Sequence, residues 1–307
     1  MPLFSVIIPA FNAADTIADT LCSIIAQTHR DWEIIVVDDG STDATREIVS
    51  AWTRNNPQIR LCGHPGNGPS DARNFGAFHL ATGDILAFCD ADDMWSNTKL
   101  AEIARVMASP LVDGAFGRVA FFTKTPEDAK SHSTLPTEPL SVPILMGENP
   151  VCTMSNLSVR RDLFVSSGGF DPSMVHNEDL DWLIRVIGGG ARLLGVDQVQ
   201  VWYRASTGGL SSDLPAMRIS RTRAMLTARR YGYEPNRATE AIYLRYLARR
   251  ALRLNLGRTE ALRLALRGMI MDPRAFCSPA RRGLATALGA CVAPFIPSAL
   301  RRALFSH

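Results

Sequence analysis

The sequence predicts an α/β fold with a mostly parallel central sheet, followed by a C-terminal helical region. Three observations carry this prediction. In the first third of the chain, short apolar runs alternate with segments of helical periodicity, which is the pattern of a parallel sheet with crossover helices. Three of these runs are followed directly by short polar or turn-forming segments. Beyond Pro215, apolar residues recur with helical spacing only.

The elements of the first third follow one another in a regular order. Residues 4–8 form the first predicted strand, and further strands are predicted at 33–37, 59–62 and 85–89, because each is a short apolar run bounded by turn signals. The helices between them carry apolar residues at helical spacing: Ile17, Leu21, Ile24 and Ile25 in the first, Ile48, Val49 and Trp52 in the second, and Ala72, Phe75, Gly76 and Leu80 in the third.

Segments 9–12, 38–41 and 90–93 come directly after three of these strands. The carboxyl ends of parallel strands meet at one edge of a sheet, and ligands of such sheets bind there. We therefore expect the three segments to converge on one rim.

The middle of the chain is less regular. Residues 123–150 are rich in Pro, Thr, Ser and charge and are expected to form a loop or lid. Residues 151–159 and 199–203 are predicted strands, and residues 178–187 a helix.

Composition is ordinary for a globular protein: 307 residues, 46% hydrophobic and 21% charged. The chain runs straight into a strand without a basic, apolar leader, so we expect no secretory signal. Its six cysteines have no metal-ligand spacing and are interpreted as buried free thiols of a cytoplasmic protein.

Charge is divided unevenly along the chain. Residues 213–307 hold 18 Arg, no Lys and 5 acidic residues, a net charge of +13, whereas residues 1–212 carry −10. In this tail, Arg245, Arg249 and Arg253 recur every four residues on a helix face separate from its apolar face, and a second helix is predicted over 259–271. The asymmetry predicts two functional surfaces.

The stretch GDILAFCDADDMW at 83–95 places three carboxylates, Asp90, Asp92 and Asp93, after a buried strand. Crowded carboxylates raise one another's pKa unless a cation lies among them. A magnesium-like cation commonly takes one or two carboxylates together with substrate phosphates. The alternative is a solvated loop of helix-capping acids.

A family resemblance rests on this stretch and two earlier ones. SVIIPAFNAADTI, QTHRDWEIIVVDDGSTDAT and GPSDARNFGAFHLATGDILAFCDADD resemble, in order and spacing, the nucleotide-sugar half of glycosyltransferase family 2, which has the Rossmann-like GT-A fold. The resemblance continues more weakly through NLSVRRDLFVSSGGFDP, EDLDWLIR and YRASTGGLS, and fades near residue 212. It implies a catalytic domain at 1–212, divided into a donor half (1–95) and an acceptor half (96–212), and a separate basic helical region at 213–307.

The resemblance implies an inverting, metal-dependent transferase that moves a sugar from a nucleoside diphosphate, most simply UDP, to a hydroxyl. In the family's D-x-D pair the first acid touches the ribose or metal and the second holds the metal, which assigns Asp90 and Asp92 to these roles with Mn²⁺ or Mg²⁺. Asp93 is left open, because a third carboxylate can orient the other two.

The resemblance also assigns residues to the donor site. It places there four residues after the first strand: Pro9, Ala10, Phe11 and Asn12. Phe11 would lie against the nucleobase, with a core Phe as the alternative. Asp39 would accept the base N–H, with helix capping as its alternative and Asp38 able to share either duty.

Arg73 would reach the base and phosphates, since a guanidinium fork suits both; its alternative is a surface ion pair with Asp71 or Asp84. On the acceptor side, Asp179 matches the family's base, which takes the proton of the acceptor hydroxyl. Glu178 is its backup. The alternative for this acidic pair is a helix N-terminus that favours acids through its dipole.

Two departures from processive synthases favour transfer of one sugar per encounter. The Q-x-x-R-W signature is absent, and no run of about twenty apolar residues could build a pore. The acceptor would be a saccharide or a lipid-linked sugar, in cell-surface polysaccharide or glycolipid biosynthesis.

Two other functions stay open: a sugar-phosphate nucleotidyltransferase and a non-catalytic carbohydrate-binding protein on the same fold. A nucleotidyltransferase would have a Gly-rich signature with Arg or Lys just after the first strand, where this sequence has PAFNAAD. A nucleic-acid partner is not expected, because the Arg-rich tail has no regularly spaced stacking aromatics. We expect region 213–307 to contact the cytoplasmic face of the inner membrane peripherally; the alternative is that it packs on the catalytic domain.

Overall fold

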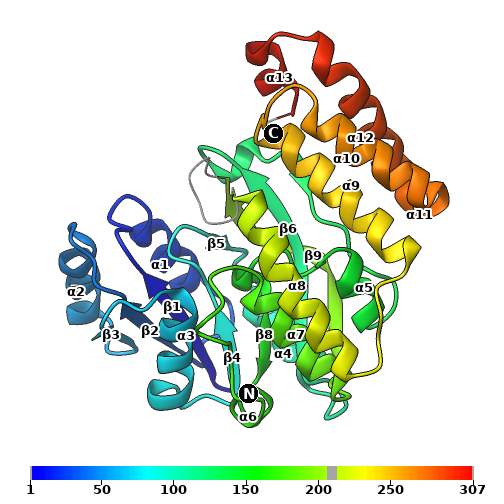
Figure 1. The fold of residues 1–307 in the computed structure, drawn as a ribbon. Coiled ribbons are helices and arrows are strands. Elements are labelled where there is room, and N and C mark those ends of the chain that lie inside the picture. The colour runs from blue at the N-terminus through cyan, green and yellow to red at the C-terminus, as the bar shows by residue number, and fades with distance from the viewer. Residues whose placement is uncertain (1, 206–212, 306–307) are drawn as a thin grey trace. The chain divides into compact units, whose positions relative to one another are not determined.

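The computed structural model describes residues 2–205 and 213–305, and the chain forms two compact units (Figure 1). The first unit comprises residues 1–140 and 150–205, and the second comprises residues 141–149 and 206–307. The predicted boundary after residue 212 lies outside the described residues. Segment 141–149, predicted within the acceptor half, belongs to the second unit.

The strands of the first unit form one sheet in the order β3-β2-β1-β4-β8-β6-β9-β5, with β7 paired to β6. Their bounds are β1 (Phe4–Ala10), β2 (Trp32–Asp38), β3 (Ile59–Gly63), β4 (Ile85–Phe88), β5 (Met94–Trp95), β6 (Gly114–Phe122), β7 (Ser131–His132), β8 (Ser158–Arg160) and β9 (Leu193–Arg204). The half formed by β3, β2, β1 and β4 is entirely parallel. Beyond β4 the sheet is mixed: β6 and β9 run parallel, while β8, β5 and β7 pair antiparallel. The predicted α/β class is confirmed.

Helices connect these strands. They are α1 (Ile17–Ile25), α2 (Thr45–Asn55), α3 (Pro69–Phe75), the π-helical turn η1 (Gly76–Leu80), α4 (Lys99–Met107), η2 (Pro126–Asp128), η3 (Met154–Asn156), α6 (Arg161–Ser166) and α7 (Glu178–Gly188). α3 begins after Gly68, whose φ of +102° suits glycine, and Pro69 occupies its first turn, where a missing N–H costs nothing. Gly76 lets this helix lie against β1, because a Cβ there would meet Ile7 Cγ2 at 2.8 Å.

Several elements differ from the sequence-based expectation. Segment 123–150, expected to form a loop or lid, contains η2, β7 and a helix at Val142–Gly147. Residues 151–159 are not one strand, because the Asn156 side chain donates to the carbonyls of Gly117 and Val151 and bends the segment into η3 before β8 begins. Strand β6 was not predicted, because its glycines weaken the strand signal. Gly117 is needed there, since a Cβ would lie 2.5 Å from the Gln200 side chain of β9.

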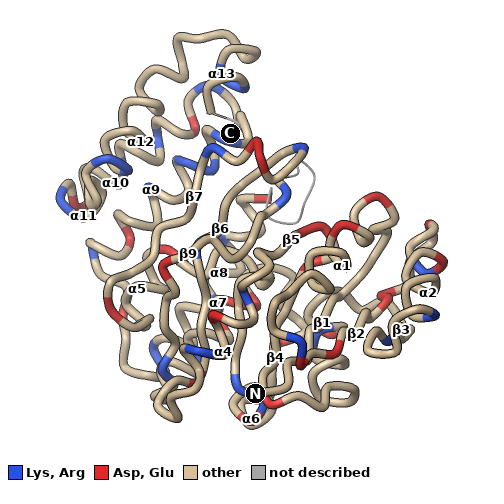
Figure 2. The backbone as a smooth tube through the Cα atoms, turned by 180° about the vertical axis from the view of Figure 1, so that it is seen from behind, with Lys and Arg blue, Asp and Glu red and all other residues tan. Residues whose placement is uncertain are grey.

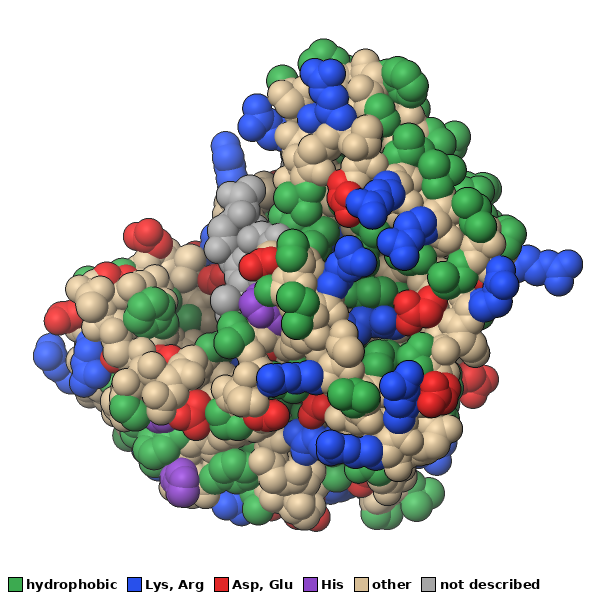
Figure 3. Space-filling view, in the orientation of Figure 1, with side chains coloured by type: hydrophobic (Ala, Val, Ile, Leu, Met, Phe, Trp, Pro, Cys, Tyr) green, Lys and Arg blue, Asp and Glu red, His purple; other side chains and the backbone are tan. Residues whose placement is uncertain are grey.

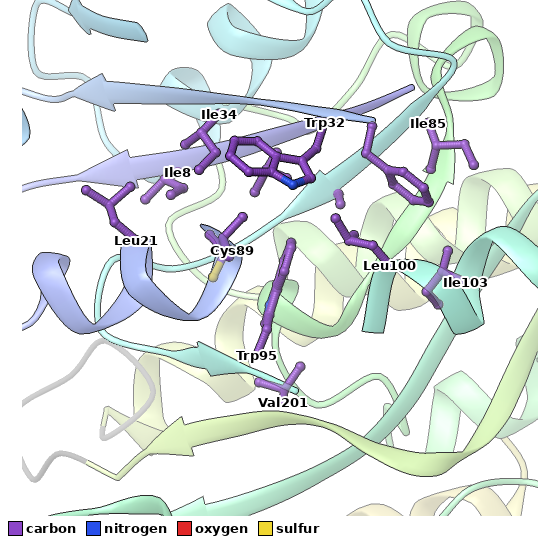
Figure 4. Close-up of a cluster of buried hydrophobic side chains, with 14 of the residues drawn as sticks. Ile8, Leu21, Trp32, Ile34, Ile85, Cys89, Trp95, Leu100, Ile103 and Val201 are labelled. Atoms are coloured by element: carbon purple, nitrogen blue, oxygen red, sulfur yellow. The ribbon is translucent and has the colours of Figure 1, made fainter. Parts of the chain in front are cut away.

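One apolar cluster of the first unit lies between β1, β2, β4 and the helices α1 and α4 (Figure 4). Trp95 and Cys89 lie within it. Cys89 is buried, but Cys22, Cys152 and Cys291 are exposed, so the expectation of buried thiols is wrong for these three. For Cys22 and Cys291, which lie on helices, apolar neighbours in sequence do not predict burial, because a helix turns a different residue outward at each step.

The second unit is helical, as predicted. It consists of α5 (Val142–Gly147), α8 (Leu214–Arg230), α9 (Arg237–Arg253), α10 (Glu260–Met271), α11 (Pro273–Cys277), α12 (Ala280–Val292), η5 (Ala293–Phe295) and α13 (Ser298–Phe305). These helices enclose their own core around Leu247, Leu264 and Phe276. Arg245, expected on a face apart from the core, is buried instead. No helix among the described residues has the length and apolarity needed to cross a membrane.

Candidate active site

The three polar segments that follow β1, β2 and β4 do converge on one rim. The register pairs Ala10 with Asp38 and Ile7 with Phe88, so the strands end at similar heights. Asn12, held at a φ of +49°, links two segments: its N–H donates to Ser41 Oγ at 3.0 Å, and its Oδ1 accepts from the Thr42 N–H at 2.9 Å. Acidic segments gather beside α1 and β5 in Figure 2.

Asp39 anchors the loop that leads into α3. Its carboxylate accepts from the N–H groups of Asn67 at 3.2 Å and Gly68 at 2.8 Å, and His64 Nδ1 lies 2.9 Å from the same group. It does not cap α2, which has no side-chain cap; near the start of that helix Asp43 accepts from the Thr45 N–H at 3.0 Å. Asp38 faces Arg46 at 2.8 Å instead. Asp39 therefore shapes the loop beside the predicted nucleobase position.

Phe11 is 62% exposed on the same rim, directly after β1. The alternative of a core Phe is wrong. An exposed ring on a rigid strand end is a surface on which a flat base can stack.

Arg73 is at the centre of the site. Its side chain is only 6% exposed, and its guanidinium contacts Asp90 at 2.5 Å and Glu178 at 3.3 Å. The alternative of a surface pair with Asp71 or Asp84 is wrong. Burial works to lower the pKa of Arg73, but Asp90 and Glu178 raise it above its ordinary value, so the side chain stays charged. One buried cation thus joins the D-x-D segment to the N-terminus of α7.

Asp93 points away from solvent and fastens the acidic segment. It accepts from Ser155 Oγ at 2.6 Å and from the Arg204 N–H at 3.0 Å, and Ser155 Oγ in turn accepts from the Asp90 N–H at 2.9 Å. Arg204 Nε donates to the Asp92 carbonyl at 3.0 Å. Burial first, then Asp92 and Asp90, raise the pKa of Asp93 well above its usual range. Asp93 therefore orients its neighbours from within the protein.

Thr153, Ser155 and Arg204 were not assigned by sequence reasoning. Thr153 Oγ1 donates to Asp90 at 3.2 Å. Short hydroxyl residues in an irregular loop carry no sequence signal for such contacts, because their partners lie about sixty residues away. Arg204 lies in the quoted stretch YRASTGGLS, whose residues 206–212 are outside the described part of the chain.

Asp92 is the half-buried carboxylate at the end of this segment. Burial first, then the neighbouring Asp90, raise its pKa to about 6. A raised pKa of this origin shows that nearby cations only partly offset the crowding of carboxylates. No three His, Cys, Asp or Glu side chains cluster at metal spacing within residues 2–205 and 213–305. The carboxylates of Asp90 and Asp92 are oxygen donors of the kind that a hard divalent cation takes together with the oxygens of a bound diphosphate.

Glu178 and Asp179 begin α7, directly after Asn177, which adopts a left-handed φ of +56°. Burial first, then Asp179, raise the pKa of Glu178 to about 7, against the opposing effect of Arg73. Trp182, one turn further on, is buried and packs against Phe164 and Phe170. The aromatic packing of Trp182 thus holds α7 in place, and the start of this helix presents the carboxylates of Glu178 and Asp179 beside Arg73.

Comparison with known proteins identifies the kind of site. The family model described as Glycosyl transferase family 2 matches residues 5–166. An uncharacterized glycosyltransferase of Nostoc is 34% identical over 174 residues, which are 55% of this chain and 54% of the relative. The first curated relatives are thus matched over about half of their own length or less.

One curated relative is matched over more of its length. The UDP-Glc:alpha-D-GlcNAc-diphosphoundecaprenol beta-1,3-glucosyltransferase WfaP of Escherichia coli is 27% identical over 215 residues, 69% of this chain and 81% of that protein.

Two solved structures share the fold. Staphylococcus aureus TarS 1-349 with UDP-GlcNAc superposes with a TM-score of 0.64 at 18% identity, over 98% of this chain and 87% of that one. The Pyrobaculum calidifontis mannosyltransferase with GDP-Man and Mn²⁺ gives 0.59 at 22% identity, over 99% and 84%. These likenesses confirm the predicted GT-A fold class with a C-terminal helical region.

Proposed function

The chain belongs to glycosyl transferase family 2, and we propose that its first unit transfers a hexosyl or N-acetylhexosaminyl group from a nucleoside diphosphate to a hydroxyl acceptor, one sugar per encounter. The donor is most simply a UDP-sugar, the nucleotide named with both WfaP and the TarS complex. Family membership sets aside the nucleotidyltransferase alternative. The transfer inverts the configuration at the reacting carbon.

One observation carries the proposal: a single bonded network joins the D-x-D segment to the acidic start of α7. Arg73 is its centre, in contact with Asp90 on one side and Glu178 on the other. A donor diphosphate on the D-x-D side and an acceptor on the α7 side would therefore lie on either side of one buried cation. A non-catalytic binding protein has no need for this arrangement.

On the donor side, Phe11 stacks on the base and Asp39 accepts its N–H, with Pro9, Ala10 and Asn12 forming the strand end beneath. Asp92 would hold the metal, and Asp90 would contact the ribose or the same metal. A bound Mn²⁺ or Mg²⁺ would neutralise the charge that develops on the departing diphosphate. Asp90 is already engaged by Arg73 and Thr153, so Asp92 is the principal ligand.

On the acceptor side, Asp179 acts as the general base. The acceptor oxygen bonds to the anomeric carbon as the bond to the diphosphate oxygen breaks, and Asp179 takes the hydroxyl proton. Glu178 accepts from Arg73. A carboxylate that takes a proton loses its charge, and with it the ion pair to Arg73. Glu178 is therefore better suited to hold Arg73 in place than to act as the base.

We place the acceptor on a lipid at the cytoplasmic face of the inner membrane, because WfaP is named for a diphosphoundecaprenol-linked sugar. The second unit supports this with an exposed apolar stripe on α12 and η5, formed by Leu284, Leu288, Val292 and Phe295. Hydrophobic side chains interspersed with basic ones gather over α10 and α12 in Figure 3. A basic and apolar surface of this kind binds anionic lipid interfaces.

A donor screen tests the proposal. UDP-, GDP- and dTDP-sugars are each added with and without Mn²⁺, and thermal stabilisation and release of nucleoside diphosphate are measured. We expect one nucleotide class to stabilise the protein and to be hydrolysed slowly, with both effects stronger with metal. Stabilisation without any hydrolysis or transfer would support the carbohydrate-binding alternative instead.

A further inference from the structure

Glu148 in the second unit is surrounded by three arginines. Arg282 Nη2 lies 2.5 Å from its carboxylate, Arg245 Nη2 lies 3.5 Å away, and Arg249 Nη1 lies 3.8 Å away. Glu148 follows α5, Arg245 and Arg249 lie one turn apart on α9, and Arg282 is on α12. Three guanidiniums therefore meet one carboxylate, so these four side chains together carry a net charge of +2.

The three arginines differ in the hydrogen bonds that their side chains make. Arg245 is buried and donates to the Phe276 carbonyl at 3.0 Å and to the Ser278 carbonyl, so its Nη1 closes the end of α11. Its Nε is buried without a hydrogen-bond partner. Arg249 makes no hydrogen bond within residues 2–205 and 213–305, and its side chain is 32% exposed. Burial first, then the charge of Arg282, lower the pKa of Arg249 to about 10.

We propose that Arg249, Arg282 and the edge of Arg245 form a binding site for a phosphate or diphosphate group. The guanidinium fork matches phosphate oxygens in a bidentate manner. Glu148 balances one of the three positive charges of this cluster. A dianion would balance the other two.

A role in stabilising the fold alone explains the cluster less well than a binding role does. Like charges one helical turn apart destabilise a helix, so Arg249 beside Arg245 costs stability. Glu148 already has a close partner in Arg282, and Arg245 already has backbone carbonyls, so neither needs Arg249. Arg249 is also open to solvent, where a ligand can reach it.

Titration of the full chain with pyrophosphate in EDTA tests the site, because carboxylates of the D-x-D segment repel this anion when no metal is present. We expect Arg249→Gln to weaken binding about tenfold or more, which corresponds to about 1.4 kcal/mol. Arg267→Gln is the matched control, because Arg267 is an exposed arginine on α10 and its loss changes the net charge equally. We expect it to leave the affinity unchanged.

Glu148→Gln is a second variant that removes the competing carboxylate, and we expect it to tighten pyrophosphate binding. Circular dichroism checks that each variant is folded. Absence of binding by the wild-type chain, equal weakening by Arg249→Gln and Arg267→Gln, or weaker binding in Glu148→Gln would overturn the proposal.

The phosphate can be free or carried by a lipid. Vesicles of phosphatidylcholine with and without phosphatidic acid distinguish the two sources. If Arg249→Gln lowers binding to the phosphatidic acid vesicles more than Arg267→Gln does, the site takes a lipid phosphate. If the two variants bind these vesicles equally while only Arg249→Gln loses pyrophosphate, the site takes a free anion.

Discussion

Replacing Glu178 by Gln should make the folded protein more stable at pH 8 and leave it unchanged at pH 4.5. The side chain is 13% exposed, and burial raises its pKa from an ordinary value of 4.5 to about 7. The folded state therefore holds the Glu178 proton more tightly than the unfolded state does. Stability falls as the pH rises from 4.5 through 7, because the folded state must ionise a buried carboxyl.

The size of the effect follows from the two pKa values. Each unit of difference between the folded and unfolded pKa corresponds to about 1.4 kcal/mol. The ionised Glu178 therefore costs the folded state about 3 kcal/mol above pH 7, already including the attraction of Arg73. Gln keeps an acceptor oxygen for Arg73 and carries no charge, so it removes most of this cost.

Urea unfolding followed by tryptophan fluorescence measures the effect, with EDTA present throughout. All five tryptophans, at positions 32, 52, 95, 182 and 202, lie in the first unit, so the signal reports the unit that contains Glu178. Wild type and Glu178→Gln are compared from pH 4.5 to pH 8. Glu47→Gln is the control, because Glu47 is exposed on α2 in the same unit.

We expect the difference between wild type and Glu178→Gln to grow with pH and to level off above pH 7, while Glu47→Gln follows the wild type. If Glu178→Gln were instead destabilised at pH 8, the ion pair with Arg73 would outweigh burial. The argument that the folded state disfavours this carboxylate would then be refuted.

The remaining predictions concern the donor site, the base and the apolar stripe. Asp92→Asn should lower transfer by about a hundredfold while the protein stays folded, since a metal ligand is lost; full activity in EDTA would contradict the metal assignment. Asp179→Asn should abolish transfer but keep UDP affinity in calorimetry, and a collapse of that affinity would move Asp179 to the donor site or to folding. Phe11→Ala should weaken UDP binding by about 1–3 kcal/mol, the range for stacking of a base on an aromatic ring, at unchanged stability; equal affinity would remove the stacking role. Leu288→Ser combined with Phe295→Ser should reduce flotation with anionic vesicles, and unchanged flotation would remove the stripe from the membrane contact.

The sequence was sufficient to predict that the polar segments after β1, β2 and β4 share one rim, because the relevant information is local. A buried run followed by Asp90 or by Asp38 and Asp39 reports both a strand and its end, and parallel topology then brings these ends together. The exposure of Phe11 was not decided by sequence, because an apolar residue after a strand can point to either side. The structure gives this answer directly, with the ring 62% exposed.

The links across the site could not be predicted, because they join residues far apart in the chain. Arg73 and Glu178 are 105 positions apart, and Asp93 and the Arg204 N–H are 111 apart. Each alternative considered from sequence for Arg73 used a neighbour within about eleven positions. Its partners are Asp90, which follows β4, and Glu178, which begins α7, and only the fold brings these segments together.

Glu178 also decides between the two explanations of the acids at the start of α7. A helix dipole stabilises an acid in the first turn by about 0.3–1 kcal/mol. Burial and the adjacent Asp179 act against it, and the raised pKa of about 7 shows that they win. An acid placed there only for the dipole would keep a low pKa. The carboxylate therefore lowers the stability of the folded chain, and its contact with Arg73 supplies a reason for it: the pair fixes a buried cation that connects the proposed donor and acceptor sides. Stability given up at a reaction site in this way is a common exchange in enzymes.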